Sequence, residues 1–247
     1  MKRVNKRSLL ILLACFVVPG VVLRAKADII YTTLGPDRLY VSGGSGLGVN
    51  GMPIILGAVA FTPSHNYLLT EIDTGIQLMN TWPPTSGNTG GFILGLYEDS
   101  NGLPGTVELG LWGFEAPPWS IIIYHPEDET LEEVPVCCPL LTATTPGISL
   151  AAEHQYWLVV APDIPPQYNA TNVWWAGNTL GLTGPVARAD IIPGDDYYVL
   201  PPWPWVASTG NLPAFEVRGI PTPEPSSLFL LFTGLAGLAA FRRKRRS

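Results

Sequence analysis

The sequence predicts an all-β protein, a single β-sandwich of jelly-roll type, with one apolar segment near each end of the chain. Glycine and proline are frequent, at 26 and 25 of 247 residues, and they interrupt the chain at intervals too short for most helices. The segments between them are rich in β-branched and aromatic residues, which favour strands. An OB-like or propeller-like barrel is the alternative, although no internal repeat supports a propeller.

The body of the protein, residues 28–219, is long enough for one sizeable core. Within residues 67–79 polar and apolar positions alternate, and the set containing Thr70, Ile72 and Thr74 is expected to face inward. The glycine-rich run 42–46 lacks the lysine of a phosphate-binding loop and is expected to form a flexible hairpin or loop. The predicted strands are residues 54–62, 67–79, 92–97, 121–124, 155–160 and 172–175.

Residues 1–27 have the three parts of a signal peptide. A basic beginning is followed by the largely apolar run 9–23, and Ala25 and Ala27 satisfy the small-x-small rule for cleavage. Signal peptidase would therefore leave Asp28 as the first mature residue. Lipidation of Cys15 is the alternative, but the apolar stretch before it is only about six residues long.

The charge of the body excludes one class of partner. All twenty acidic residues of the chain lie between positions 28 and 224, whereas Arg38, Arg188 and Arg218 are the only cations there. Three cations against twenty acidic residues give residues 28–225 a formal charge of −17. Nucleic-acid binding requires clustered cations, so we expect no nucleic-acid partner.

No motif of the body predicts an enzyme, a cofactor or a metal site. The three histidines lie in no recognisable catalytic pattern, and the adjacent Cys137 and Cys138 lack further ligands at metal-binding spacing. The turn at residues 99–102 offers oxygen ligands, but it lacks the remaining ligands of a calcium loop and is expected to be a hairpin turn. A secreted hydrolase with two paired carboxylates remains the third functional hypothesis.

Residues 220–247 combine several unlike elements in a fixed order. Residues 220–223 are expected to form an extended spacer, because prolines favour polyproline geometry. After Pro-Glu-Pro, residues 226–241 contain no charged side chain. Their sixteen residues would span about 24 Å as a helix, against a hydrocarbon core of about 30 Å. We expect a transmembrane helix, whose five following cations keep the C-terminus in the cytoplasm.

This order of elements resembles the PEP-CTERM sorting signals of Gram-negative bacteria. The resemblance implies that an exosortase, a membrane-embedded transpeptidase, recognises the segment and cuts near Pro-Glu-Pro. The helix would anchor the protein transiently, and the body would then pass to the cell surface or extracellular matrix. The residues that would carry the signal are Pro223, Glu224, Pro225, Arg242, Arg243, Lys244, Arg245 and Arg246.

The body also resembles the choice-of-anchor β-sandwich domains of exported bacterial proteins. The resemblance rests on residues 61–62, 67–78 and 94–106, with a Leu-Tyr-Glu-Asp turn and a Pro-Gly-Thr exit, and on the later segments 155–160 and 174–175. It implies a surface module of unassigned activity.

Eight tryptophans are the most suggestive feature of the body. Exposed aromatic rings can stack on sugar rings, and Trp203 and Trp205 are the candidate glycan contacts; the alternative is that most tryptophans serve packing. The sequence thus predicts a non-enzymatic surface protein, structural or adhesive in exopolysaccharide or biofilm. A carbohydrate-binding module is the second hypothesis.

Overall fold

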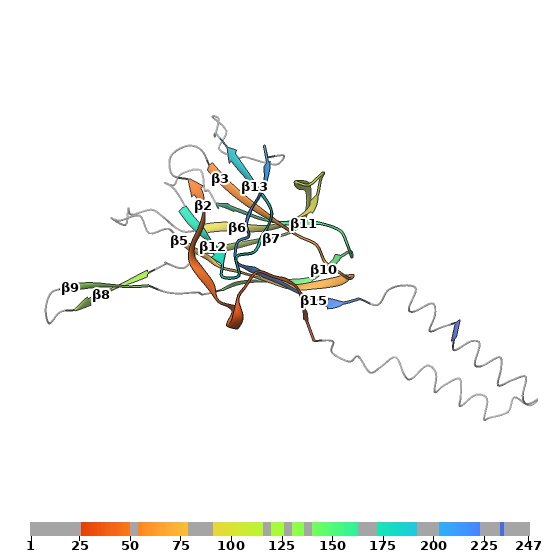
Figure 1. Cartoon of the computed structure of the whole chain (residues 1–247), viewed down its shortest axis with the longest axis horizontal. Helices are drawn as coiled ribbons and strands as arrows, with labels where there is room; N and C mark the ends of the chain where they lie inside the picture. The colour runs from red at the N-terminus through yellow and green to blue at the C-terminus, as the bar shows by residue number, and fades with distance from the viewer. Residues whose placement is uncertain are drawn as a thin grey trace, which may run out of the picture.

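The computed structural model describes residues 26–49, 54–78, 91–115, 120–125, 130–135, 140–162, 172–191, 203–222 and 233–234. The predicted all-β class is confirmed, because strands dominate these residues (Figure 1). Among them, no helix is both long and apolar enough to cross a membrane. The predicted C-terminal helix, apart from residues 233–234, and most of the predicted signal peptide lie outside the described residues.

The strands form two main sheets and a separate hairpin. The four-stranded sheet, called sheet A, has the order β1-β15-β4-β10, and the nine-stranded sheet B has the path β5-β12-β2-β3-β11-β6-β7 with β13 and β14 attached at β3. Sheet A contains β1 (Asp28–Thr32), β15 (Phe215–Pro221), β4 (Tyr67–Thr74) and β10 (Leu141–Leu150). Sheet B contains β2 (Tyr40–Val49), β3 (Ile54–Phe61), β5 (Ile76–Leu78), β6 (Gly91–Asp99), β7 (Pro104–Glu115), β11 (Tyr156–Pro162), β12 (Asn172–Asn178), β13 (Thr183–Ile191) and β14 (Val206–Asn211). The hairpin consists of β8 (Ser120–His125) and β9 (Thr130–Pro135).

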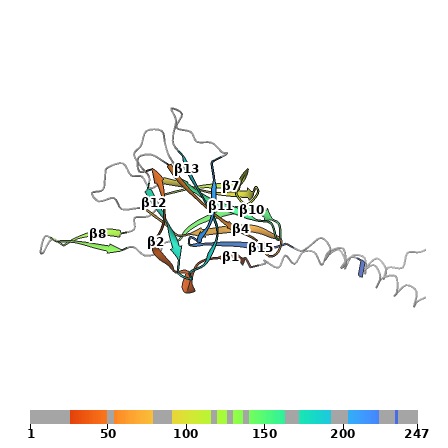
Figure 2. The same ribbon diagram turned by 45° about the horizontal axis from the view of Figure 1, so that its top comes forward.

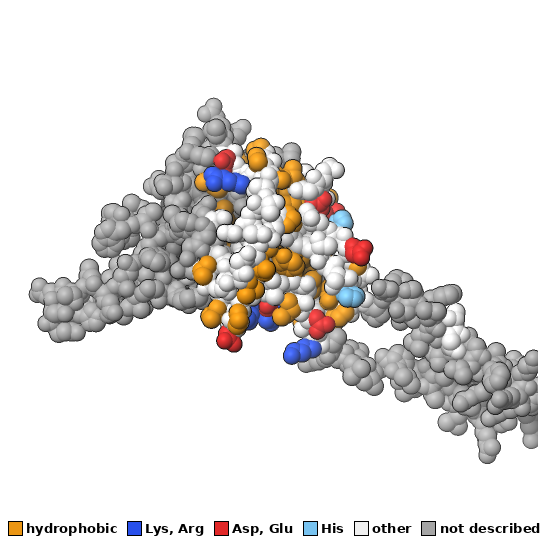
Figure 3. Space-filling view, viewed as in Figure 1, with side chains coloured by type: hydrophobic (Ala, Val, Ile, Leu, Met, Phe, Trp, Pro, Cys, Tyr) orange, Lys and Arg blue, Asp and Glu red, His pale blue; other side chains and the backbone are white. Residues whose placement is uncertain are grey.

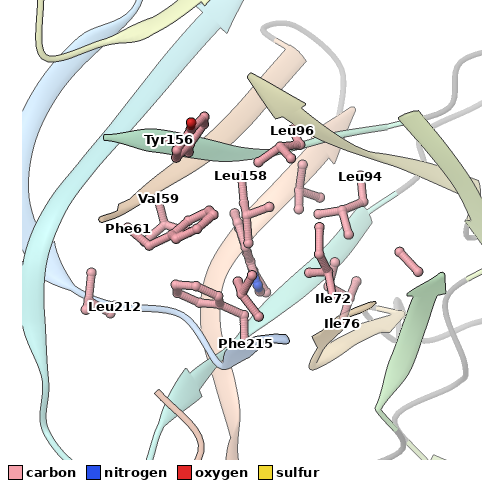
Figure 4. Close-up of a cluster of buried hydrophobic side chains, with 14 of the residues drawn as sticks. Val59, Phe61, Ile72, Ile76, Leu94, Leu96, Tyr156, Leu158, Leu212 and Phe215 are labelled. Carbon is pink, nitrogen blue, oxygen red and sulfur yellow. The ribbon is translucent and has the colours of Figure 1, made fainter. Parts of the chain in front are cut away.

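One hydrophobic cluster joins the two sheets. Ile72 and Phe215 extend from sheet A and meet Phe61, Leu96 and Leu158 of sheet B, and these side chains point toward one another (Figure 4). Large apolar side chains of this kind contribute about 1.5–3 kcal/mol each when they leave water. The main core of the described residues therefore lies between sheets A and B.

Strand β3 is the branch point of sheet B. One edge of β3 pairs with β11 through residues 57–61 and with β2 through Ile54 and Ile55, while the other edge pairs with β13. Strands β2 and β12 run steeply across the direction of β4 and β15 (Figure 2). Away from its hairpin with β3 at Gly48 and Val49, β2 pairs with β12 alone among the described strands.

The structure corrects two local expectations. The glycine-rich run 42–46 lies inside β2, where it pairs with β12, and does not form a flexible loop. In β4, both neighbouring strands skip Thr70 in their register, so Leu69 and Ile72 are both fully buried. A bulged residue shifts the alternation by one, which explains why the predicted inward set omitted Leu69.

Candidate functional site

The two predicted export segments adjoin the same end of sheet A. Strand β1 begins at Asp28, which is the predicted first mature residue, and Asp28 lies opposite Gly219 of the antiparallel strand β15. Ala27 of the predicted cleavage site is exposed and directly precedes β1, whereas Ala25 lies outside the described residues. The start of β1 and the end of β15 therefore lie side by side (Figure 1). We call this region, formed by Asp28, Asn66, Tyr67 and residues 219–222, the exit end.

Asn66 ties three segments together at the exit end. Its backbone oxygen accepts a hydrogen bond from the Thr222 N–H at 2.9 Å, and its Oδ1 accepts one from the Ala152 N–H at 2.8 Å. The Glu153 N–H donates to the Pro63 oxygen at 2.8 Å. The turn between β3 and β4, the turn between β10 and β11, and the end of β15 are thus joined.

The expected spacer at residues 220–223 is partly ordered in the sheet. Ile220 lies opposite Leu68 and Pro221 opposite Tyr67 within the β15 and β4 pair. With the Thr222 hydrogen bond, the folded body continues to the residue before Pro223. The spacer expectation was wrong for residues 220 and 221. Strand β1 does not pair with β15 beyond Gly219, so Pro221 can lie opposite Tyr67 without the loss of a ladder bond on that side.

A cluster of charges supports β15 on the outward face of sheet A. Asp73 and Glu216 lie directly opposite each other on neighbouring strands, and both side chains are almost fully buried. Arg38 Nη2 hydrogen-bonds Asp73 Oδ2, and Arg218 Nη2 lies 2.5 Å from Glu216 Oε1. Like charges at opposed positions repel, so the two guanidinium groups are what make this burial tolerable.

The charge cluster also perturbs its members. Burial, a hydrogen bond with Asp73 and repulsion from its charge raise the pKa of Glu71, against the opposing attraction of Arg218 and Arg38. Burial lowers the pKa of Arg218, but the hydrogen bond with Glu216 and the attraction of its charge outweigh burial, so the pKa is raised. Arg188 is the third arginine of the body, and its Nε donates to Asp190 Oδ1 at 2.6 Å. Each cation of the body is therefore paired, and few positive side chains appear on the face shown in Figure 3.

Trp203 and Trp205 lie on the outward face of sheet B. Both are half-buried, and they pack against two clusters that include Ala58, Trp157 and Ala189. Their rings are perpendicular, with centroids 5.6 Å apart. The structure therefore brings the two predicted glycan contacts together and fixes their orientation, while part of each ring serves packing. Their role in glycan binding stays a prediction.

Other tryptophans serve the interior. Trp157 and Trp175 are buried, and their indole N–H groups donate to Asp99 Oδ1 at 2.7 Å and to Thr74 Oγ1 at 2.9 Å. Burial with a satisfied indole donor is typical of packing residues.

The residues 99–102 form the expected hairpin turn between β6 and β7. Asn101 and Gly102 have φ values of 58° and 78°, and Asp99 Oδ2 accepts a hydrogen bond from the Gly102 N–H at 3.1 Å. Among the described residues, no group of three or more His, Cys, Asp and Glu side chains could hold a metal ion. Cys137 and Cys138 lie outside those residues.

Comparison with known families identifies the C-terminal segment. Residues 221–246 match the PEP-CTERM protein-sorting motif, which confirms the predicted signal. The motif implies export and processing by exosortase, a membrane protein. A search of curated proteins found no relative of the chain. The matched range covers the eight predicted signal residues, which themselves lie outside the described residues, and it begins at Pro221, the last residue of β15.

Proposed function

We propose that this protein is a non-enzymatic component of the cell surface or extracellular matrix, made with a signal peptide at residues 1–27 and tethered by residues 226–241 until an exosortase releases it. The observation that carries the proposal is the sorting motif, which begins at the end of a strand of the folded body. Because β1 and β15 are neighbours, a tether at either terminus would hold the body by the same end.

The body is proposed to be one jelly-roll sandwich and a choice-of-anchor type surface module. The shared core of sheets A and B supports a single folding unit. Its surface suits a hydrated matrix, because its three arginines are paired with carboxylates and the remaining acidic side chains leave a large negative excess. We infer a structural or adhesive role in exopolysaccharide or biofilm.

Replacement of Pro223, Glu224 and Pro225 by alanine tests the sorting step. We expect the triple variant to accumulate in the membrane at full length, because the recognised signal is lost while the apolar segment is retained. Mass spectrometry of membrane and surface fractions would locate both ends of each species. Glu108→Ala, which changes an exposed glutamate of β7, is the control and should be processed normally. Recovery of uncut Arg242–Arg246 in surface material from the native strain would contradict the proposal.

A carbohydrate-binding role is the second candidate, supported by the paired rings of Trp203 and Trp205. Because packing holds each ring in place, a sugar would meet an oriented aromatic surface with little loss of side-chain freedom. Retention on insoluble polysaccharide should fall when both residues are changed to alanine. Trp112→Phe is the control, since Trp112 lies on β7 outside these clusters. Unchanged retention of the double variant would exclude this surface as the contact.

A further inference from the structure

A pocket of about 530 Å³ lies between β2 and β14, with β3 at its base. Strand β2 pairs with β12 on one edge, and on the other it pairs with β3 only through Gly48 and Val49. Strand β14 pairs with β13 alone among the described strands. The pocket therefore lies where two strands of one sheet diverge and each leaves an edge without a partner among the described strands.

The register of β14 shows which backbone groups face its free edge. In an antiparallel pair, residues that bond the partner strand alternate with residues that point away from it. Pro185 has no N–H to donate and lies opposite Thr209. The backbone groups of Pro185 and Thr209 therefore point away from each other. Ala207 lies two residues before Thr209, so its backbone groups have the same orientation. Ala207 and Thr209 thus direct their N–H and C=O groups away from β13, and no described strand receives them.

The residues of β14 also lack the charges and prolines that usually prevent strand addition. Its six residues, Val206 to Asn211, include no charge and no proline. In contrast, β1 carries Asp28 and a register shift, and β10 has a register shift between Thr144 and Ile148. The edge strand β7 carries Glu108 and Glu115. Unprotected edges of this kind are templates for pairing with another chain.

The pocket beside this edge suits uncharged side chains. Val41, Ile55 and Val186 contribute apolar surface, and Ser45, Ser208 and Asn211 contribute neutral polar groups. Arg188 is the one charged residue of the lining, and it is already paired with Asp190. The aromatic residue of the lining, Trp175, is only 2% exposed, so it offers no ring face on which a sugar could stack.

We propose that β14 and this pocket bind an extended, non-acidic segment of a second protein. The segment would add as a strand to Ala207 and Thr209 and place every second side chain, an apolar one, in the pocket. A second copy of this chain fits less well, since each body carries a formal charge of −17.

The position of the pocket allows binding before release. Leu212 and Pro213 of its lining come just before β15, whereas Thr222 follows the other end of that strand. The pocket and the exit end thus lie at opposite ends of β15. A body held by its exit end would still present the pocket to a partner.

The test uses the full chain in lipid nanodiscs and a fluorescent octapeptide of alternating threonine and valine with a lysine at each end. We expect saturable binding by fluorescence anisotropy. Thr209→Pro should weaken it about tenfold, because proline removes one free-edge donor. Thr209→Val keeps that donor and is the matched control.

A second arm leaves the protein unchanged, in case the proline variant does not fold. Methylation of alternate peptide nitrogens on the octapeptide removes its strand hydrogen bonds but keeps its side chains, and should abolish binding. Equal binding of the methylated peptide would overturn the proposal, as would equal binding by Thr209→Pro. Self-association of the native chain that Thr209→Pro removes would assign the edge to a second copy instead. Displacement of the peptide by cellohexaose would assign the pocket to a glycan.

Discussion

The outward faces of the two main sheets are covered in opposite ways. On sheet A the buried side chains are carboxylates, Asp73 and Glu216, which Arg38 and Arg218 neutralise. On sheet B they are mostly alanines and other apolar groups, covered in part by Trp203 and Trp205. One cover is electrostatic and specific in position, and the other is apolar.

This difference indicates how β15, the strand that leads into the sorting signal, is held in place. Arg218 lies opposite Glu71 and pairs with it, and Arg38 contacts both Asp73 of β4 and Glu216 of β15. A slip of β15 by one residue would turn Glu216 and Arg218 to the other face of the sheet and break these contacts. Slippage across an apolar face would mainly exchange one contact for another. We infer that the charged cover fixes the register of β15, the strand that leads directly to the exit end.

The largest effect is expected from Arg38→Leu. This variant leaves Asp73 without its guanidinium partner, and the neighbouring Glu216 loses part of its compensation. Loss of a partner from a fully buried pair costs about 3–5 kcal/mol, and because the Arg38 side chain is 39% exposed we expect about 2–3 kcal/mol here. Urea unfolding of the full chain in detergent, followed by tryptophan fluorescence, measures this change.

The matched control is Arg188→Leu. Its ion pair with Asp190 is exposed on both sides, so its loss should cost less than about 1 kcal/mol. Equal destabilisation by the two substitutions would show that burial of the carboxylates is not what makes Arg38 important.

Some features of the fold and of the sorting signal could be predicted from the sequence. Strands β3, β6 and β11 were predictable because most of their residues are apolar, β-branched or aromatic. The sorting signal was predictable because three unlike elements coincide in order. Local composition sufficed in both cases.

Features that depend on distant neighbours were not predictable. Glycine-rich β2 is a strand because β12 pairs along it, and β14 is one because β13 does. The sequence did not indicate that the buried charges form one cluster. Arg38 and Asp73 are 35 positions apart, and Glu216 lies much later in the chain. The pocket arises from the divergence of strands at β3, which no local pattern records.

Trp205→Ala tests the apolar cover and should have a smaller effect. The ring is half-buried against Ala189 and its neighbours, so its removal should cost about 1–2 kcal/mol. Because no charge is involved, the cost should be similar at low and high salt, unlike that of Arg38→Leu. Trp205→Phe should retain much of the stability. A strong salt dependence of the Trp205→Ala effect would remove the distinction between the two faces.

The smallest effect is a pH dependence carried by Glu71, at the rim of the charged cover. Its pKa is raised in the folded state, so between its ordinary value and the raised one the folded chain binds more protons than the unfolded chain. The contribution of Glu71 is therefore fully present below the ordinary pKa and is lost as the pH rises through the raised one. Glu71→Gln cannot titrate and should flatten this part of the stability profile, while Glu108→Gln on the exposed β7 is the control. Unfolding free energies measured at several pH values above the ordinary pKa of glutamate would show the difference. An unchanged slope in Glu71→Gln would mean that Arg38 and Arg218 already cancel the repulsion from Asp73, and the charged cover would then hold β15 without any sensitivity to protons at its rim.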